Sequence, residues 1–291
     1  MNGVKYIQEK QRNWAMQKGV ELVGGTKHNR GEKNYVASLC ENVFEGSLSE
    51  ETQQDFKNGD GNETNDSEAR LAKMKALHSS SALAVNVFQY WQHKDVNPIL
   101  YACRLSNRKG FEEKSRPNTV RFEQKFEISN DKKTFPRSPN LDVVIACDNM
   151  VYAIESKFTE PYKGKQKGLN EKYLGDKTFW RGIPKLEQLA RENSPKNKTF
   201  KYLDAAQLLK HILGLKTQKG KTGFKLLYLW YDVLGKDGFE HRKEIEVFAE
   251  IAKKDNVQFR AISYQEVIIN LSKNFYKGNK VYVDYLTNRY L

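Results

Sequence analysis

Residues 139–157 read PNLDVVIACDNMVYAIESK, and this stretch decides the fold that the sequence predicts. Two short apolar runs of β-favouring residues, 143–145 and 151–154, lie on either side of Asp148 and Asn149. Asp and Asn tolerate the positive φ that a two-residue hairpin turn requires. The pattern therefore predicts a tight antiparallel hairpin.

The predicted turn fixes which residues face each other across the hairpin. It pairs Cys147 with Met150 and, further along the same register, Asp142 with Glu155. Directly opposed residues have Cβ atoms about 4.5–5.5 Å apart, and Lys157 shares a face with Glu155 because side chains alternate along a strand. Two adjacent carboxylates repel unless a proton or a cation lies between them, and Mg²⁺ prefers such oxygens. We therefore predict a site made of Asp142, Glu155 and Lys157.

A structural interpretation of the same residues is also open. Glu155 and Lys157 would then form an ordinary ion pair, and Asp142 would begin a strand after a Pro-Asn turn. The predicted register favours a site, because it brings all three residues to one end of the hairpin. Both faces of the hairpin are otherwise apolar, which is typical of strands inside a sheet.

Length and composition indicate a globular protein. The 291 residues, 38% of them hydrophobic, suffice for one large domain or a core domain with an N-terminal extension. No run approaches the ~18 apolar residues of a membrane span, and the first residues lack the apolar core of a signal peptide. The 3 cysteines fit neither a disulfide framework nor a zinc site, so we expect a cytoplasmic protein.

Positive charge is concentrated just after the predicted site. The net charge is +13, and residues 157–225 contain 17 Lys and Arg against 6 Asp and Glu. A basic surface beside carboxylates suits a polyanion, although lysines also serve solubility. We expect contacts with nucleic acid from four residues: Lys163, Lys165, Lys167 and Arg181. Phe179 and Trp180 would either stack on bases or anchor a small helix to the core.

The remaining pattern predicts an α/β fold with a mixed sheet flanked by helices. We expect helices over residues 1–18, from Asp66 or Ser67 to Met74, and over 83–91, about 201–213, 241–254 and 264–275, and strands over 119–128, 224–233 and 257–263. Asp204, Gln207 and His211 form a polar stripe on one helix. We divide the chain into an extension with a polar linker (1–67) and a main domain (68–291) with a basic insertion at about 158–200.

Taken together, these features resemble the PD-(D/E)xK nuclease superfamily, which has the restriction-endonuclease-like fold. More narrowly, it is similar to a family of bacterial proteins regarded as restriction endonucleases. The likeness rests on HSSSALAVNVF (78–88), RFEQKF (121–126), PNLDVVI and IESKF, and it extends over roughly residues 68–270. Two residues separate Pro139 from Asp142, whereas the motif that names the superfamily has Pro and Asp adjacent.

The resemblance implies roles for individual residues. Asp142 and Glu155 would bind the metal together with the backbone carbonyl of Ser156, and Lys157 would orient or activate the attacking water. Glu123, on the preceding strand, is a candidate for an additional metal ligand, although an exposed strand glutamate explains it equally well. Gln207 would border the site and support it without being catalytic.

The resemblance also implies an activity. We expect a Mg²⁺-dependent DNA endonuclease of a restriction or defence system, with Mn²⁺ as a substitute, that leaves a 5′-phosphate and a 3′-hydroxyl. A homodimer and a companion methyltransferase are expected partners. The alternatives are a nucleic-acid-binding protein that keeps this fold without chemistry, and a nuclease for RNA or structured DNA.

Overall fold

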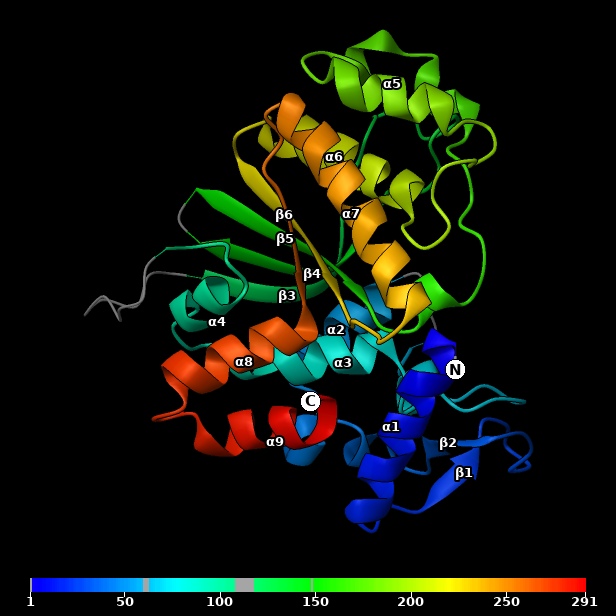
Figure 1. Ribbon diagram of the computed structural model, residues 1–291, viewed down its shortest axis with the longest axis vertical. Helices are drawn as coiled ribbons and strands as arrows, with labels where there is room; N and C mark the ends of the chain where they lie inside the picture. Colours follow the sequence, from blue (N-terminus) through cyan, green and yellow to red (C-terminus); the bar gives the residue numbers. More distant parts are fainter. Residues whose placement is uncertain (1, 60–62, 108–117, 148) are drawn as a thin grey trace.

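The computed structural model describes residues 2–59, 63–107, 118–147 and 149–291 (Figure 1). Its α-helices are α1 (Gly3–Gln17), α2 (Glu50–Asn58), α3 (Ser80–Phe88), α4 (Asn97–Ala102), α5 (Pro184–Glu192), α6 (Ala205–Lys219), α7 (Lys236–Lys254), α8 (Tyr264–Phe275) and α9 (Lys280–Tyr290). Its strands are β1 (Leu22–Gly24), β2 (Lys33–Val36), β3 (Asn118–Lys125), β4 (Asn140–Cys147), β5 (Met150–Lys157), β6 (Phe224–Trp230) and β7 (Phe259–Ser263).

A five-stranded mixed sheet forms the centre of the fold, in the order β3-β4-β5-β6-β7. Strand β4 is antiparallel to both β3 and β5, whereas β5, β6 and β7 run parallel to one another. Helices α6 and α7 make the two crossovers between the parallel strands, as such connections require. The expected α/β class with a mixed sheet flanked by helices is confirmed.

The hairpin of β4 and β5 has the predicted register. Cys147 pairs with Met150, and the pairing continues to Val143 with Ile154. The next step in this register sets Asp142 opposite Glu155. Of the two predicted turn residues, Asp148 lies outside the described residues.

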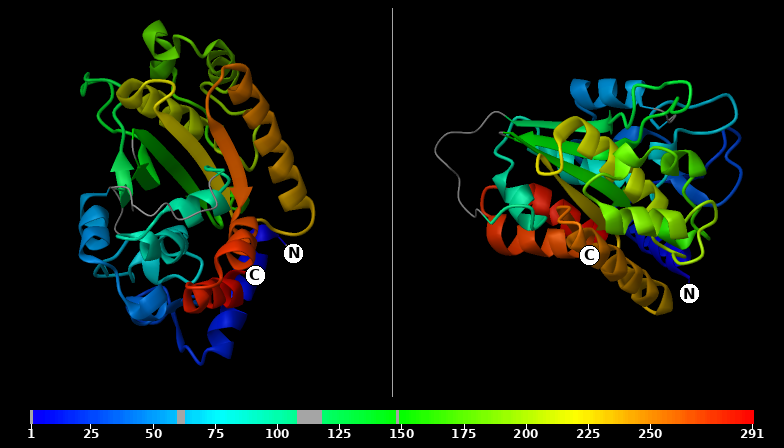
Figure 2. Two further views of the ribbon diagram at one scale, coloured as in Figure 1. Left: turned by 90° about the vertical axis from the view of Figure 1, so that its left-hand side faces the viewer. Right: turned by 90° about the horizontal axis from the view of Figure 1, so that it is seen from above.

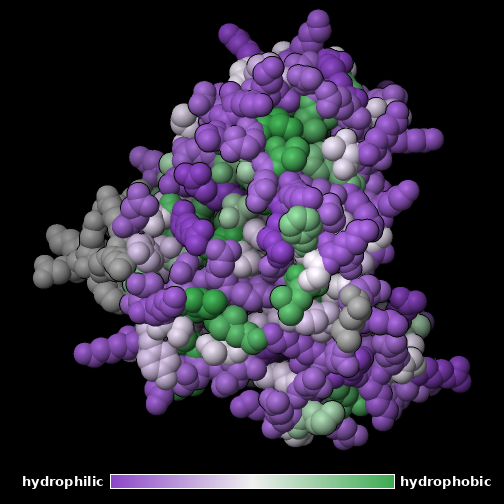
Figure 3. Space-filling model, in the orientation of Figure 1, coloured by the Kyte–Doolittle hydropathy of each residue, from purple (hydrophilic) through white to green (hydrophobic). Residues whose placement is uncertain are grey.

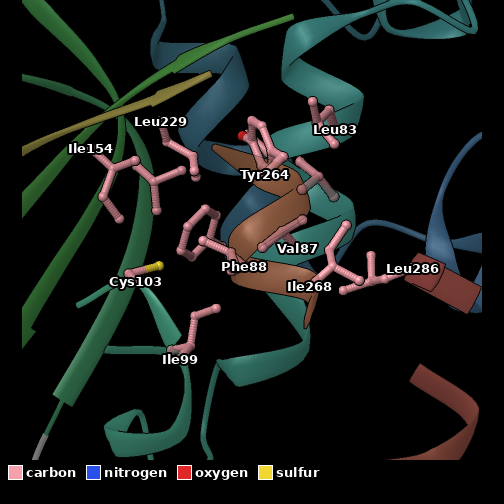
Figure 4. Packing of buried hydrophobic residues seen from close by; sticks show 14 of the residues in the cluster. Leu83, Val87, Phe88, Ile99, Cys103, Ile154, Leu229, Tyr264, Ile268 and Leu286 are labelled. Carbon is pink, nitrogen blue, oxygen red and sulfur yellow. The ribbon is translucent and has the colours of Figure 1, made fainter. Parts of the chain in front are cut away.

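Apolar side chains cover both faces of the sheet. Val143, Ile145 and Ile154 belong to one core cluster, whereas Val144 and Val151 belong to another. Figure 1 shows α3, α4, α8 and α9 on the first face and α5, α6 and α7 on the second. Figure 4 shows the first core, where side chains of α3 and α8 pack against the sheet residues Ile154 and Leu229. The expected alternation of the hairpin residues between two apolar layers is therefore confirmed.

The N-terminal residues pack on the first core. Ile7, Val43 and Phe56 are members of that cluster, and α1 packs against α9. Figures 1 and 2 show the blue N-terminal helix beside the red C-terminal one. The boundary expected at residue 67 stays a prediction, and the linker before it falls partly on residues 60–62, outside the described residues.

The expectations about helices need correction in two respects: one expected helix is not formed, and α2, α4, α5 and α9 were not expected. Residues 66–74 are not an α-helix, because Leu71 N–H donates to Gly25 O, and the Asp66 side chain accepts from Ala72 N–H. The polar residues that suggested a helix cap thus close irregular turns. Helix α9 adds a further apolar surface to the first core through Tyr282, Leu286 and Tyr290.

The surface is largely hydrophilic. On the face shown in Figure 3, purple hydrophilic residues predominate, and the apolar residues form small separate groups. None of the helices in the described ranges is both long enough and apolar enough to cross a membrane.

Candidate active site

The three residues predicted to form a site meet at one edge of the sheet. Asp142 lies near the start of β4, and Glu155 and Lys157 lie near the end of β5, so antiparallel pairing brings them together. The Ser156 backbone N–H donates to Asp142 Oδ2 at 2.6 Å. Lys157 Nζ donates to Glu155 Oε1. The structure thus joins both carboxylates and the lysine in one connected group.

The two carboxylates have opposite electrostatic environments. Burial would raise the pKa of Glu155, but Lys157 and His211 outweigh it and lower that pKa to about 2. Asp142 has a pKa well above its usual value because it is partly buried beside the negative charge of Glu155, and Lys157 compensates only in part. Glu155 therefore carries a stable charge, whereas the charge of Asp142 calls for a further cation.

Lys157 is held in its charged form. Burial would lower its pKa, but attraction to Glu155 and Asp142 raises it above the usual value, and Glu160 adds to the effect. Glu160 is itself fixed, because it accepts hydrogen bonds from the Phe158 backbone N–H at 2.9 Å and from Ser80 Oγ at 3.0 Å. The sequence pattern did not indicate Glu160, since nothing in its spacing distinguishes it.

Glu123 also reaches the group. It lies on β3 between Phe122 and Gln124, whose partners on β4 are the two neighbours of Asp142. Its backbone is left-handed, with φ of 52°, which is uncommon for a non-glycine residue. Its carboxylate accepts a hydrogen bond from Asn140 Nδ2 and contributes to the raised pKa of Asp142. Glu123 is thus a third carboxylate near the predicted metal ligands.

Helix α6 contributes the polar stripe that the sequence indicated. Asp204 caps the helix by accepting from Gln207 N–H at 2.8 Å. His211 is 1% exposed, and its Nε2 lies 2.8 Å from Glu155 Oε2. The side chain of Gln207 lines two cavities beside the site. The helical spacing indicated that His211 lies on the stripe but gave no role for it, because its partner is 56 residues away in the chain.

Two neighbouring cavities open beside the site. The larger, of about 490 Å³, is lined by Gln207 and His211 together with basic side chains. The smaller, of about 180 Å³, is lined by Lys157 and Glu160. Asp204 and Gln207 line both, so the cavities adjoin each other along the start of α6.

The four residues expected to contact nucleic acid are all exposed: Lys163, Lys165, Lys167 and Arg181. Of these four, Lys167 lines the larger cavity. Phe179 and Trp180 are buried in the second core, and Trp180 Nε1 donates to Tyr173 O at 2.8 Å. The interpretation of these two aromatic residues as anchors of a small helix to the core is therefore confirmed, since both lie in the short 3-10 helix Lys177–Trp180.

The carboxylates suit a hard cation better than a soft one. Within the described ranges, no three His, Cys, Asp or Glu side chains are grouped to hold a metal. A cation here would instead bind the carboxylates of Asp142 and Glu155, and a backbone oxygen and water would complete its coordination shell. Mg²⁺ is usually coordinated in this way. The raised pKa of Asp142 fits such an ion.

The mixed sheet with an acidic pair and a lysine at its edge defines a restriction-endonuclease-like α/β protein. A family model described as "Restriction Endonuclease associating with ARP" matches residues 8–291, and the chain belongs to this family. No curated protein and no solved structure matches the chain. Membership in this family supports a nuclease role in restriction, with DNA as the substrate.

Proposed function

We propose that the chain is a Mg²⁺-dependent endonuclease that hydrolyses phosphodiester bonds of DNA in a restriction or defence system. The observation that carries this proposal is the meeting of Asp142, Glu155 and Lys157 at one sheet edge, where the charge of Asp142 lacks full compensation. A structural ion pair alone would need only Glu155 and Lys157. The family membership supports the same conclusion.

Each residue has a task in this proposal. Asp142 and Glu155 would bind Mg²⁺ with the backbone carbonyl of Ser156, and Glu123 would support them as a further acid. The bound ion would supply a Lewis acid and lower the pKa of a water molecule, and Mn²⁺ would substitute for it. Lys157 would stabilise the negative charge that develops on the phosphate. Gln207 would border the substrate between the two cavities.

The larger cavity provides a path for the phosphate backbone. Its lining includes four basic side chains: Arg137, Lys167, Lys172 and Lys210. Cations along a groove bind phosphates and make affinity fall steeply with salt. Because this cavity adjoins the one that Lys157 lines, a DNA strand that follows it would reach Lys157. We propose that Lys163, Lys165 and Arg181 add longer-range attraction from the exposed surface.

The test uses a random-sequence DNA pool, the corresponding RNA and a four-way DNA junction, each incubated with Mg²⁺, with Mn²⁺ and with a chelator. We expect cleavage of the DNA pool with either metal, 5′-phosphate ends, and no cleavage with the chelator. Asp142→Ala and Glu155→Ala should abolish cleavage but still bind DNA. Salt-sensitive binding of DNA without cleavage under any metal would contradict the proposal and favour a binding protein.

Assembly and location complete the proposal. Cutting both strands of a duplex often uses two sites, so we propose a homodimer on DNA. Protection of the host genome would require a companion methyltransferase, and we place the system in the cytoplasm. Sedimentation with and without a cleavable duplex would measure the assembly.

A further inference from the structure

His211 is a buried polar residue that the proposed catalytic steps leave unused. It lies on α6 among apolar residues of the second core, and its side chain is 1% exposed. Within the described part of the chain, neither ring nitrogen makes an aligned hydrogen bond. Burying a polar group without a partner costs free energy, so such a residue calls for an explanation.

The surroundings of Glu155 supply that explanation. Its two carboxylate oxygens face different side chains, because Lys157 Nζ donates to Oε1 and His211 Nε2 lies 2.8 Å from Oε2. The side chain of Glu155 is 1% exposed, so water does not take the place of either neighbour. His211 therefore limits the rotation of the carboxylate about its own axis.

The backbone around His211 is fixed. Gly214, one turn further along α6, packs closely on Phe126, the residue that follows β3. A Cβ added at Gly214 would lie 2.5 Å from Phe126 O. The helix begins at a side-chain cap, Asp204, and ends at Gly220 with φ of 69°. A helix held at this distance from the sheet keeps the imidazole against Glu155.

We propose that His211 is a positioning residue that holds the Glu155 carboxylate in the orientation needed to bind a divalent cation. The inference rests on the proposed function, since it assumes that Glu155 binds the metal. Residues that orient metal ligands commonly contribute 10–100-fold to metal affinity or activity. The family resemblance assigns no role to this position, and the inference comes from the contact itself.

Three substitutions separate positioning from packing. The side chain of His211→Gln places an amide nitrogen near the position of Nε2, whereas that of His211→Asn is too short to reach Glu155. The two variants have the same chemistry and differ in reach. His211→Leu keeps the volume and removes all polarity. A packing role predicts that Leu is tolerated and that Gln and Asn behave alike.

The experiment measures Mn²⁺ binding to the full chain, and the electron paramagnetic resonance signal of free Mn²⁺ reports how much metal is unbound. We expect wild-type affinity to fall about 10–100-fold in His211→Asn and His211→Leu, and to stay within about threefold in His211→Gln. Thermal unfolding without metal checks that each variant is folded. Equal Mn²⁺ affinity in wild type, His211→Asn and His211→Leu would overturn the inference.

Glu155→Ala distinguishes this failure from that of the proposed function. We expect that variant to lose Mn²⁺ binding. If Glu155→Ala loses binding while His211→Asn keeps it, only the role of His211 is wrong. If Glu155→Ala binds Mn²⁺ as the wild type does, the metal site is wrong and the role of His211 is wrong with it.

Discussion

Asp142 is the residue of the site whose negative charge is least stabilised. Burial and the neighbouring Glu155 raise its pKa well above the usual value, whereas the pKa of Glu155 is lowered to about 2. Lys157 donates its hydrogen bond to Glu155 and so compensates that carboxylate directly. In the metal-free protein the negative charge of Asp142 is therefore unfavourable, and a bound cation would stabilise it.

This cost predicts a stabilising substitution. Asp142→Asn removes the charge but keeps an oxygen that accepts from the Ser156 N–H. Because the pKa of Asp142 is raised in the folded protein, its charge costs stability at neutral pH, so we expect the metal-free variant to be more stable than wild type at pH 7. Urea unfolding measures this difference, and saturating Mg²⁺ should reduce it. Glu250→Gln, at an exposed position on α7, is the control and should change little.

An Asp142→Asn protein that is less stable than wild type without metal would contradict this electrostatic account. It would mean that the hydrogen bond from Ser156 outweighs the repulsion between the carboxylates.

At the residue scale, the sequence predicted the site because strand alternation is strict. Once two residues form the turn, every opposed pair follows, and Asp142, Glu155 and Lys157 share one end. His211 could not be predicted in the same way. Its contact with Glu155 depends on how α6 lies on the sheet, and residue spacing within the helix shows only which residues share a stripe.

At the scale of elements, α7 docks on the sheet through a buried histidine. His241 Nε2 lies 3.0 Å from the Tyr228 hydroxyl, and Nδ1 lies 3.3 Å from the Tyr162 hydroxyl. Burial, aided by the charge of Arg242, lowers the pKa of His241 to about 3. The ring is therefore neutral in the folded protein at every pH above that value.

The lowered pKa of His241 predicts acid-sensitive stability. Unfolded histidine has a pKa of about 6.5, so below that pH the unfolded chain binds a proton that the folded chain does not. The contribution of neutral His241 to the free energy of unfolding is complete above pH 6.5 and is lost as the pH falls toward 3. Between pH 7.5 and 5.0 we expect a loss of about 2 kcal/mol from this residue.

Urea unfolding at both pH values tests this dependence in wild type and two variants. His241→Gln should unfold more easily at pH 7.5 and show a smaller difference between the two pH values. His28→Gln changes an exposed histidine and should keep the wild-type difference. An unchanged difference in His241→Gln would show that another group causes the acid sensitivity.

Elements with strong local signals were predicted well. Helix α8 has the expected bounds because a capping box of Ser263 and Glu266 begins it. The false helix at residues 66–74 had suitable capping residues, but Asp66 and Ser67 accept from N–H groups of irregular turns, and the backbone of Leu71 pairs with Gly25 instead. Long-range pairing of this kind leaves no local pattern in the sequence.

At the scale of the whole molecule, Arg289 joins the two ends of the chain. It lies on α9, is 1% exposed, and donates to Gln11 Oε1 at 3.1 Å and to Asn42 O at 2.9 Å. Gln11 Nε2 donates back to Arg289 O at 3.1 Å. The first and last helices thus share a buried polar network beside the first core, and the sequence did not reveal it because its members are far apart in the chain.

Breaking this network should destabilise the whole protein. Arg289→Met leaves the buried oxygens Gln11 Oε1 and Asn42 Oδ1 without their donor, at about 1–3 kcal/mol for each unsatisfied group. We expect a loss of about 3 kcal/mol and a single cooperative urea transition. Arg191→Met, at an exposed ion pair on α5, is the control and should cost less than about 1 kcal/mol.

Two separate transitions in Arg289→Met would instead show that residues 1–67 unfold independently of the main domain. That result would contradict the integrated core, in which Ile7 and Phe56 pack with α3 and α8.

The most direct measurement of the central claim is the rate at which DNA is cut in Mg²⁺ by wild type and by Lys157→Ala. Losing a group that stabilises charge in the transition state commonly costs about 10²–10³-fold in rate. We predict a loss of at least about 100-fold for Lys157→Ala, with DNA binding retained, and a wild-type rate for the exposed Lys254→Ala control. Cutting by Lys157→Ala within a few-fold of the wild-type rate would contradict the claim that Asp142, Glu155 and Lys157 form the active site.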